Sequence, residues 1–211
     1  MTYRIAKTAF AAAVLTSAAW ACSKNDAQTP RPSEEIEAAD APASAPAASA
    51  ATATDDSSLA RGSDAERKSK NGMLEADIGG VSVHVLYGRP EARGRALFGD
   101  LVPYGEVWRT GADEATTITL DKDTLFEGQK VPAGSYALFT IPNETEWTVV
   151  LNRTAKQWGA YKYDQAQDLL RVEVTPMQKE HTEALTFETE GDHLVLRWGT
   201  LAVPMKIEPA S

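Results

Sequence analysis

The feature that most constrains the fold of this chain is an alternation of apolar and polar side chains along its C-terminal part. In VSVHVLY, residues 81–87, valines at every second position are separated by Ser82 and His84. A period of two puts alternate side chains on opposite faces of a strand, so the pattern is typical of a half-buried β-strand. Further strand-like segments occupy residues 116–120, 135–141, 146–152, 169–174, 184–190 and 193–198.

Short connectors rich in proline and glycine separate these segments. Pro132-Ala133-Gly134 and Gly191-Asp192 suit the tight turns of antiparallel hairpins, and only residues 164–170 have the composition of a helical turn. Short strands at this spacing predict an all-β fold, an antiparallel β-sandwich of the immunoglobulin-like or jelly-roll type in preference to a barrel, with at most a short helix. Pro204 lies in the last strand-like stretch and predicts that this strand forms a sheet edge.

Residues 1–21 have the composition of a secretion signal. Arg4 and Lys7 precede an uncharged run of small and apolar residues, and this run is too short to span a bilayer as a mature helix. Ala19-Trp20-Ala21-Cys22 resembles a bacterial lipobox, in which the cysteine is acylated. Because serine and not aspartate follows Cys22, the resemblance implies an outer-membrane lipoprotein that faces the periplasm. The alternative is cleavage just before an incidental cysteine, which gives a soluble periplasmic protein.

The next segment, residues 22–72, is dominated by alanine, proline, serine and charged residues. Such a composition cannot bury enough apolar surface to offset the entropy of ordering, so we expect a disordered linker before a folded domain at residues 73–211. Acidic residues outnumber basic ones by 30 to 21, a net charge of −9, which disfavours nucleic acid as a partner. Cys22 is the one cysteine, so an intrachain disulfide is excluded.

A long loop rich in glycine and arginine, residues 88–115, interrupts the strand pattern. Its cations are all arginine, and the planar guanidinium suits bidentate pairing with carboxylate or phosphate. In a structural interpretation, Arg109 or Arg89 pairs with Asp168 or Glu114 and locks the loop onto the sheet. In a functional interpretation, the arginines hold an anionic or hydroxyl-rich small molecule against an indole face.

Several motifs resemble those of the bacterial family of domains of unknown function DUF2911, notably YGRP, GRALFGDLVPYGEVWRTGADEAT, VPAGSYALFTIP and QWGAYKYDQAQDLLRVEV. The likeness runs in order from Tyr87 to Trp198. It implies an exported, often lipid-anchored all-β protein, and no reaction. Motif positions suited to ligand binding or to a structural ion-pair cluster are Arg89, Arg95, Trp108, Arg109, Asn152, Trp158, Tyr163, Asp168 and Arg171.

Other kinds of site have little support in the sequence. His84, His181 and His193 are scattered, so neither a metal nor another cofactor is expected. Two hypotheses remain. One is a lipid-anchored module that binds a small polar or anionic ligand, or an envelope protein, through the arginine- and tryptophan-rich loop. The other is a small hydrolase-like enzyme with Asp168 or Glu114 as general acid or base and arginine stabilising negative charge.

Overall fold

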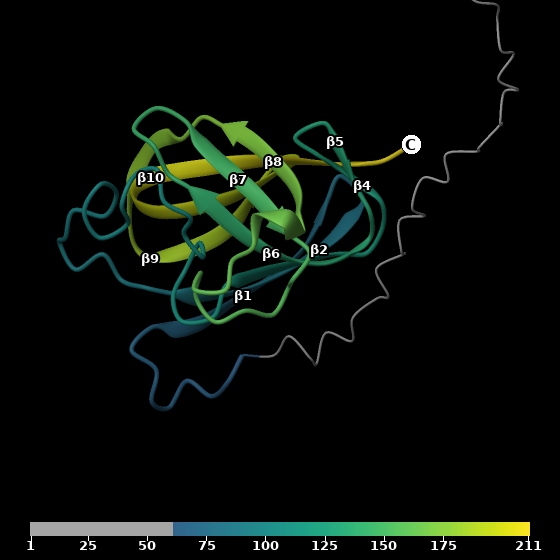
Figure 1. The fold of residues 1–211 in the computed structure, drawn as a ribbon. Helices are drawn as coiled ribbons and strands as arrows, with labels where there is room; N and C mark the ends of the chain where they lie inside the picture. The colour runs from purple at the N-terminus through teal and green to yellow at the C-terminus, as the bar shows by residue number, and fades with distance from the viewer. Residues whose placement is uncertain (1–60) are drawn as a thin grey trace, which may run out of the picture. The chain divides into compact units, whose positions relative to one another are not determined.

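The structure is a computed structural model that describes residues 61–211; the predicted signal, Cys22 and most of the predicted linker lie outside the described residues. The described chain is almost entirely β-structure (Figure 1). Its elements are β1 (Lys70–Ile78), β2 (Val81–Arg89), β3 (Thr116–Leu120), β4 (Thr124–Phe126), β5 (Gln129–Val131), β6 (Gly134–Ile141), β7 (Trp147–Asn152), the 3-10 helix η2 (Gln165–Gln167), β8 (Asp168–Val174), β9 (Met177–Glu190) and β10 (His193–Pro209). Within residues 61–211, no helix has the length and apolar character needed to cross a membrane.

Two antiparallel sheets form the fold. The larger sheet has the order β1-β2-β3-β6-β7-β8 and the smaller one the order β5-β4-β10-β9. The prediction of an all-β antiparallel sandwich is therefore confirmed. β1 starts at Lys70, three residues before the expected start of the domain at Met73.

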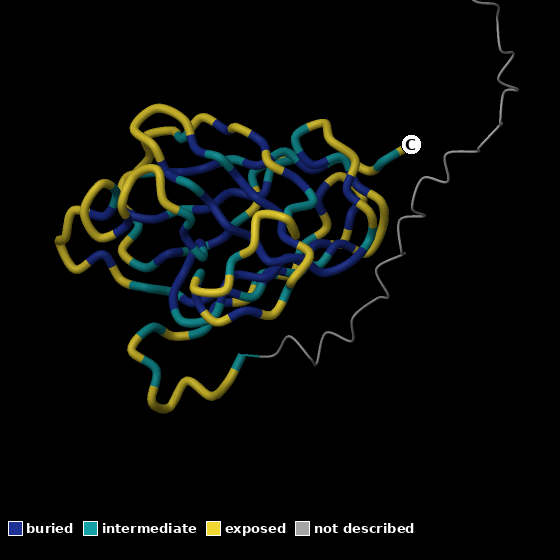
Figure 2. Tube along the Cα trace, viewed as in Figure 1, coloured by how far each residue is buried: buried dark blue, intermediate teal, exposed yellow. Residues whose placement is uncertain are grey.

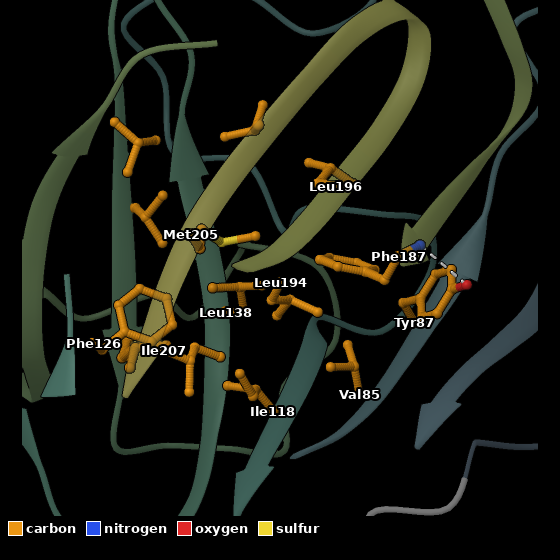
Figure 3. Close-up of a cluster of buried hydrophobic side chains, with 14 of the residues drawn as sticks. Val85, Tyr87, Ile118, Phe126, Leu138, Phe187, Leu194, Leu196, Met205 and Ile207 are labelled. Atoms are coloured by element: carbon orange, nitrogen blue, oxygen red, sulfur yellow. Dashed lines mark hydrogen bonds between the residues drawn. The ribbon is translucent and has the colours of Figure 1, made fainter. Parts of the chain in front are cut away.

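Side-chain alternation fills the space between the two sheets. In β2, Val81, Val83 and Val85 are buried, as the period of two predicts, and the outer turns are exposed (Figure 2). Figure 3 shows Val85, Ile118 and Leu138 of the larger sheet near Leu194, Met205 and Ile207 of the smaller sheet.

A polar contact crosses this core. The Phe187 N–H donates to the Tyr87 hydroxyl oxygen at 3.3 Å, and the two rings meet edge to face with centroids 4.9 Å apart (Figure 3). Tyr87 lies on β2 and Phe187 on β9, so the contact joins the two sheets.

The predicted position of Pro204 at a sheet edge is wrong. β10 lies between β4 and β9, and its register pairs with β9 end at Ala202 whereas those with β4 start at Ile207. Pro204 lies between the two sets of pairs, so its missing N–H removes no ladder hydrogen bond there. The pairing with β9 is irregular on both sides of Gly199, whose φ of 59° marks a bulge.

The loop after β2 closes one end of the sandwich by pairing with β9. The Ala92 N–H donates to the Glu183 carbonyl at 2.8 Å, and the Leu185 N–H donates to the Pro90 carbonyl at 3.0 Å. The Arg89 guanidinium adds bonds to the Leu185 carbonyl and the Thr186 hydroxyl, both at 3.3 Å. These contacts fix the start of the loop against the smaller sheet.

Candidate functional site

The second half of the long loop is held to the larger sheet at Trp108. The Trp108 N–H donates to the Thr140 carbonyl at 2.8 Å, and the Thr140 N–H donates back to the Trp108 carbonyl at 2.9 Å. The bridge adds the loop to β6 beyond the last pair of β3 with β6, Thr116 with Leu138. The WRTGADEAT motif, residues 108–116, therefore begins as an extension of this sheet.

The indole of Trp108 joins an aromatic cluster in the core. Its ring stacks on Trp198 with centroids 5.7 Å apart and an interplanar angle of 17°. Phe98, from the first half of the loop, meets Trp147 edge to face at 4.7 Å and lies 6.0 Å from Trp108. Because burial of such rings dominates core energetics, the cluster anchors both halves of the loop.

The backbone after Trp108 is strained and tightly packed. Thr110 is fully buried with a φ of 54°, a conformation that costs a β-branched residue on the order of 1–3 kcal/mol. Its surroundings hold it there, since its hydroxyl lies 3.2 Å from the Thr140 hydroxyl and its carbonyl accepts a bond from the Thr116 hydroxyl at 2.8 Å. Beside it, a Cβ on Gly88 would lie 2.4 Å from the Ala112 carbonyl oxygen. This crossing of two backbone segments fixes the position of Arg109.

Arg109 borders a hollow of about 340 Å³ between the loop and Trp198 of β10. Its Nε is buried and has no hydrogen-bond partner within residues 61–211, and the guanidinium makes no ion pair in that range. The buried Nε1 of Trp198 also lacks a partner among these residues. A buried donor without an acceptor costs about 1–3 kcal/mol, and Arg197 Nε is in the same state among the described residues. What sets Arg109 apart is that its guanidinium makes no ion pair there, whereas that of Arg197 pairs with Glu188 at 2.9 Å.

The charges around the hollow are mainly positive. Its charged side chains are Lys68, Glu91, Arg93, Arg95, Glu106 and Arg109. Arg93 pairs with Glu91 at 2.9 Å, and Arg95 donates to the Ala92 and Glu91 carbonyls at 3.0 and 2.6 Å. Four cations face two carboxylates in a chain whose net charge is −9, so the hollow is a local region of positive potential. Its apolar wall consists of Leu101, Val102, Pro103, Val107, Trp108 and Trp198.

Residues 61–69, here called the strap, form part of the same wall through Lys68 and Ser69. Arg61 docks the strap: its Nη2 donates to the Ala112 carbonyl at 2.6 Å and lies 3.0 Å from a Glu114 carboxylate oxygen. The Arg61 side chain is 4% exposed, and burial lowers its pKa. The strap was expected to belong to the linker, so its docking is a finding that composition did not predict.

Glu114 also pairs with a second arginine of the strap, Arg67. The two carboxylate oxygens of Glu114 accept bonds from Arg67 at 2.5 and 2.7 Å, and Arg67 also lies 3.3 Å from Asp113. These bonds with Arg67 are the main cause that holds the pKa of Glu114 below its usual value. Both oxygens of this carboxylate are therefore engaged by protein groups.

A separate network, here called the brace, joins Asn152, Tyr163, Asp168 and Arg171. One Asp168 oxygen accepts a bond from Asn152 Nδ2 at 2.8 Å, and the other accepts bonds from the Tyr163 hydroxyl at 2.5 Å and from Arg171 Nε at 2.8 Å. Arg171 Nη2 closes the ring by donating to the Tyr163 oxygen at 2.6 Å. Burial raises the pKa of Tyr163, with the bond to Asp168 acting in the same direction. Asp168 thus has protein donors on both oxygens.

Trp158 lies on the loop that the brace supports, at residues 153–164. The buried Asn152 accepts bonds from Thr154 N–H and Gln157 Nε2 at 3.0 and 3.1 Å, which fixes the course of this loop. The Ala115 N–H donates to the Gln157 carbonyl at 2.9 Å, and this ties the loop to the end of the WRTGADEAT motif. The Trp158 side chain itself is 60% exposed.

The predicted site residues therefore separate into distinct groups. Arg95, Trp108 and Arg109 meet at the hollow, whereas Arg89 bonds to β9. The remaining positions belong to the brace or its loop: Asn152, Trp158, Tyr163, Asp168 and Arg171. Arg109 and Arg89 were expected to pair with Asp168 or Glu114, and they do not. Asp168 pairs with Arg171 instead, and Glu114 pairs with Arg61 and Arg67 of the strap.

Sequence reasoning missed the three strap cations Arg61, Arg67 and Lys68. Their segment is polar and rich in charge, so its composition is that of a linker. A signal was present: Arg61 and Arg67 stand only nine and three residues before the first strand, within reach of its neighbours. In residues 61–211, no cluster of three or more histidine, cysteine, aspartate or glutamate side chains has metal-binding geometry.

Comparison with known proteins gives one match. The sequence model of the family described as "Protein of unknown function (DUF2911)" matches residues 69–207, from the end of the strap into β10. No curated protein and no solved structure matches the chain. The matched range includes every predicted site residue except Cys22.

Proposed function

This chain belongs to the DUF2911 family of proteins of unknown function, and from that premise we propose that it is a binding module for a small anionic ligand that also carries an apolar group. The observation that supports this most directly is Arg109, which borders the hollow and makes no ion pair within residues 61–211.

An anion is the ligand class that the wall of the hollow favours. A guanidinium without an ion pair gains from an anionic acceptor, and carboxylate or phosphate oxygens match its planar donors. Lys68 and Arg95 add positive charge around Arg109, and the single pair between Arg93 and Glu91 leaves this excess in place. An anion in the hollow therefore gains hydrogen bonds that the protein has not already made internally.

An apolar group on the ligand follows from the rest of the wall. The indoles of Trp108 and Trp198 border the hollow beside Arg109, together with the side chains of Leu101 and Val107. A volume of about 340 Å³ is at the lower end of the range for small-molecule pockets. The ligand class is thus a compact carboxylate or phosphate with an alkyl or aromatic body.

The hydrolase alternative has less support. A general acid or base needs a free lone pair or proton that faces the substrate. Asp168 and Glu114 each accept three contacts from donor side chains of the protein, and neither residue borders the hollow.

Calorimetric titration with phenyl phosphate and with inorganic phosphate tests the proposal. We expect phenyl phosphate to bind more tightly, because its ring contacts the indoles while its phosphate meets Arg109. Arg109→Gln should weaken phenyl phosphate binding by about tenfold or more, since it removes a charge-assisted contact worth about 1.5–3 kcal/mol. Lys162→Gln, on the exposed loop before η2, is the control that keeps wild-type affinity. Absence of binding to wild type, or equal binding by the two variants, would contradict the proposal.

We also propose that the module is exported and anchored to the outer membrane through a lipid on Cys22, facing the periplasm. The support is the composition of residues 1–21 and the match of residues 19–22 to a lipobox. Cys22→Ser should then appear in the soluble periplasmic fraction, while the wild type sediments with membranes. A variant that still sediments with membranes would exclude lipidation as the anchor.

A further inference from the structure

The strap is attached to the rest of the protein mainly through polar groups. Residues 62–66 and Lys68 are exposed, so the strap places little apolar surface in the core. Arg61 instead bonds to the carbonyls of Ala112 and Glu114 at 2.6 and 3.2 Å and to Asn71 Oδ1 at 3.0 Å. Segments with few buried apolar contacts open at lower free energy than the core, so the strap can be released while both sheets stay folded.

The surface on which the strap docks is also part of the hollow. Ala112, whose carbonyl accepts the shortest Arg61 bond, borders the hollow together with Gly111. On the opposite side of this contact, Lys68 and Ser69 of the strap border the same hollow. Release of the whole strap therefore withdraws Lys68 from the hollow and frees the Ala112 carbonyl on its wall.

Charge links the two places as well. Arg61, Arg67 and Arg109 are close enough for the charges of Arg67 and Arg109 to help lower the pKa of Arg61, although burial is the main cause. An anion beside Arg109 offsets part of this repulsion and so favours the docked strap. By linkage, the docked strap must favour the anion by the same factor.

We propose that the strap regulates the hollow: docked through Arg61, it completes the anion site with Lys68, and released, it lowers the affinity of that site. This inference rests on the proposed function. Arg61 acts as a positioning residue, because it does not border the hollow. The apparent affinity of the hollow falls in proportion to the fraction of molecules whose strap is docked, so a strap that is docked one tenth of the time lowers affinity about tenfold.

Two measurements on the full chain test this inference. In the first, hydrogen exchange of residues 62–69 is followed with and without saturating phenyl phosphate, and exchange should slow when the probe is bound. In the second, calorimetry compares wild type, Arg61→Gln, Lys68→Gln and the control Lys130→Gln on the β5 hairpin. We expect faster exchange of the strap and about tenfold weaker phenyl phosphate binding in Arg61→Gln, a smaller loss in Lys68→Gln and no loss in Lys130→Gln.

The outcomes separate the two proposals. If Arg61→Gln releases the strap, as judged by exchange, and still binds phenyl phosphate as tightly as wild type, the regulation is wrong and the anion site stands. If wild type does not bind the probe, both proposals are wrong. If Arg61→Gln does not fold, Arg67→Gln serves in its place, because its side chain, 13% exposed, is less buried than that of Arg61.

Discussion

Arg171 in the brace and Arg109 at the hollow are both motif arginines close to the larger sheet, and they differ in what they bind. Arg171 donates to Asp168 and to the Tyr163 oxygen, and the Tyr163 hydroxyl in turn donates to Asp168. Arg109 has a buried Nε without a partner in the described chain. The first arrangement is complete within the protein and is typical of a structural network, whereas the second leaves Arg109 without an ion pair in the described residues, as the proposed anion site requires. The difference predicts opposite consequences of mutation.

The largest effect is expected in the brace. Asp168→Ala removes the carboxylate that accepts hydrogen bonds from Asn152, Tyr163 and Arg171, so the donors of these three side chains lose this acceptor. The Asp168 side chain is 7% exposed and that of Arg171 34%, so the network is partly buried, and three donors without this acceptor should together cost about 3 kcal/mol. Urea unfolding of Asp168→Ala should show a loss of this size, with Asp164→Ala, on the exposed cap of η2, as a control of smaller effect. A loss below about 1 kcal/mol would mean that the brace is not a structural network.

An intermediate effect on stability is expected at Glu114, the carboxylate that pairs with the strap, and this effect should depend on pH. Glu114→Gln leaves the buried Arg61 without its counter-charge, at a cost of about 2 kcal/mol near neutral pH. The pKa of Glu114 is lowered in the folded protein, so its stabilisation is present above the unfolded pKa of about 4.3 and is lost as pH falls through the folded pKa. The charged groups facing it are Arg61, Arg67 and Asp113. The difference in melting temperature between wild type and Glu114→Gln should therefore shrink below about pH 4, and a difference independent of pH would contradict the assignment.

The smallest effect on stability is expected at the hollow. Arg109→Gln removes a guanidinium whose buried Nε makes no internal bond, so its free energy of unfolding should stay within about 0.5 kcal/mol of wild type, or rise. The same variant should lose phenyl phosphate binding. If Arg109→Gln destabilised the protein as much as Asp168→Ala does, Arg109 would have a structural role like that of Arg171.

The sandwich was predictable because burial on one face of a sheet imposes a period of two. β2, β3, β6, β7 and β8 contain the segments that alternation or strand composition indicated. The hairpin of β4 and β5 was not predicted, since strands of three residues are too short to show a period. β9 was predicted only from residue 184 onwards, because its exposed first half alternates little.

The site was less predictable than the fold. The arginines of the long loop drew attention to Arg95 and Arg109, which border the hollow. An ion pair between distant segments, however, depends on which backbones meet, and composition does not encode that. Glu114 pairs with Arg61 across 53 residues of chain, whereas the sequence interpretation paired it with Arg109 or Arg89. The brace, by contrast, has members close in sequence, and its Asp168–Arg171 pair has local spacing.

The crossing of Gly88 against Ala112 also sets an order in time. The strap is the first described segment of the chain, yet its acceptors at Ala112 and Glu114 adopt their positions only after β2 has formed and the long loop has turned back across it. The hollow is therefore completed only once β2 and the long loop are in place, because Arg61 of the strap bonds to carbonyls that the end of this loop supplies.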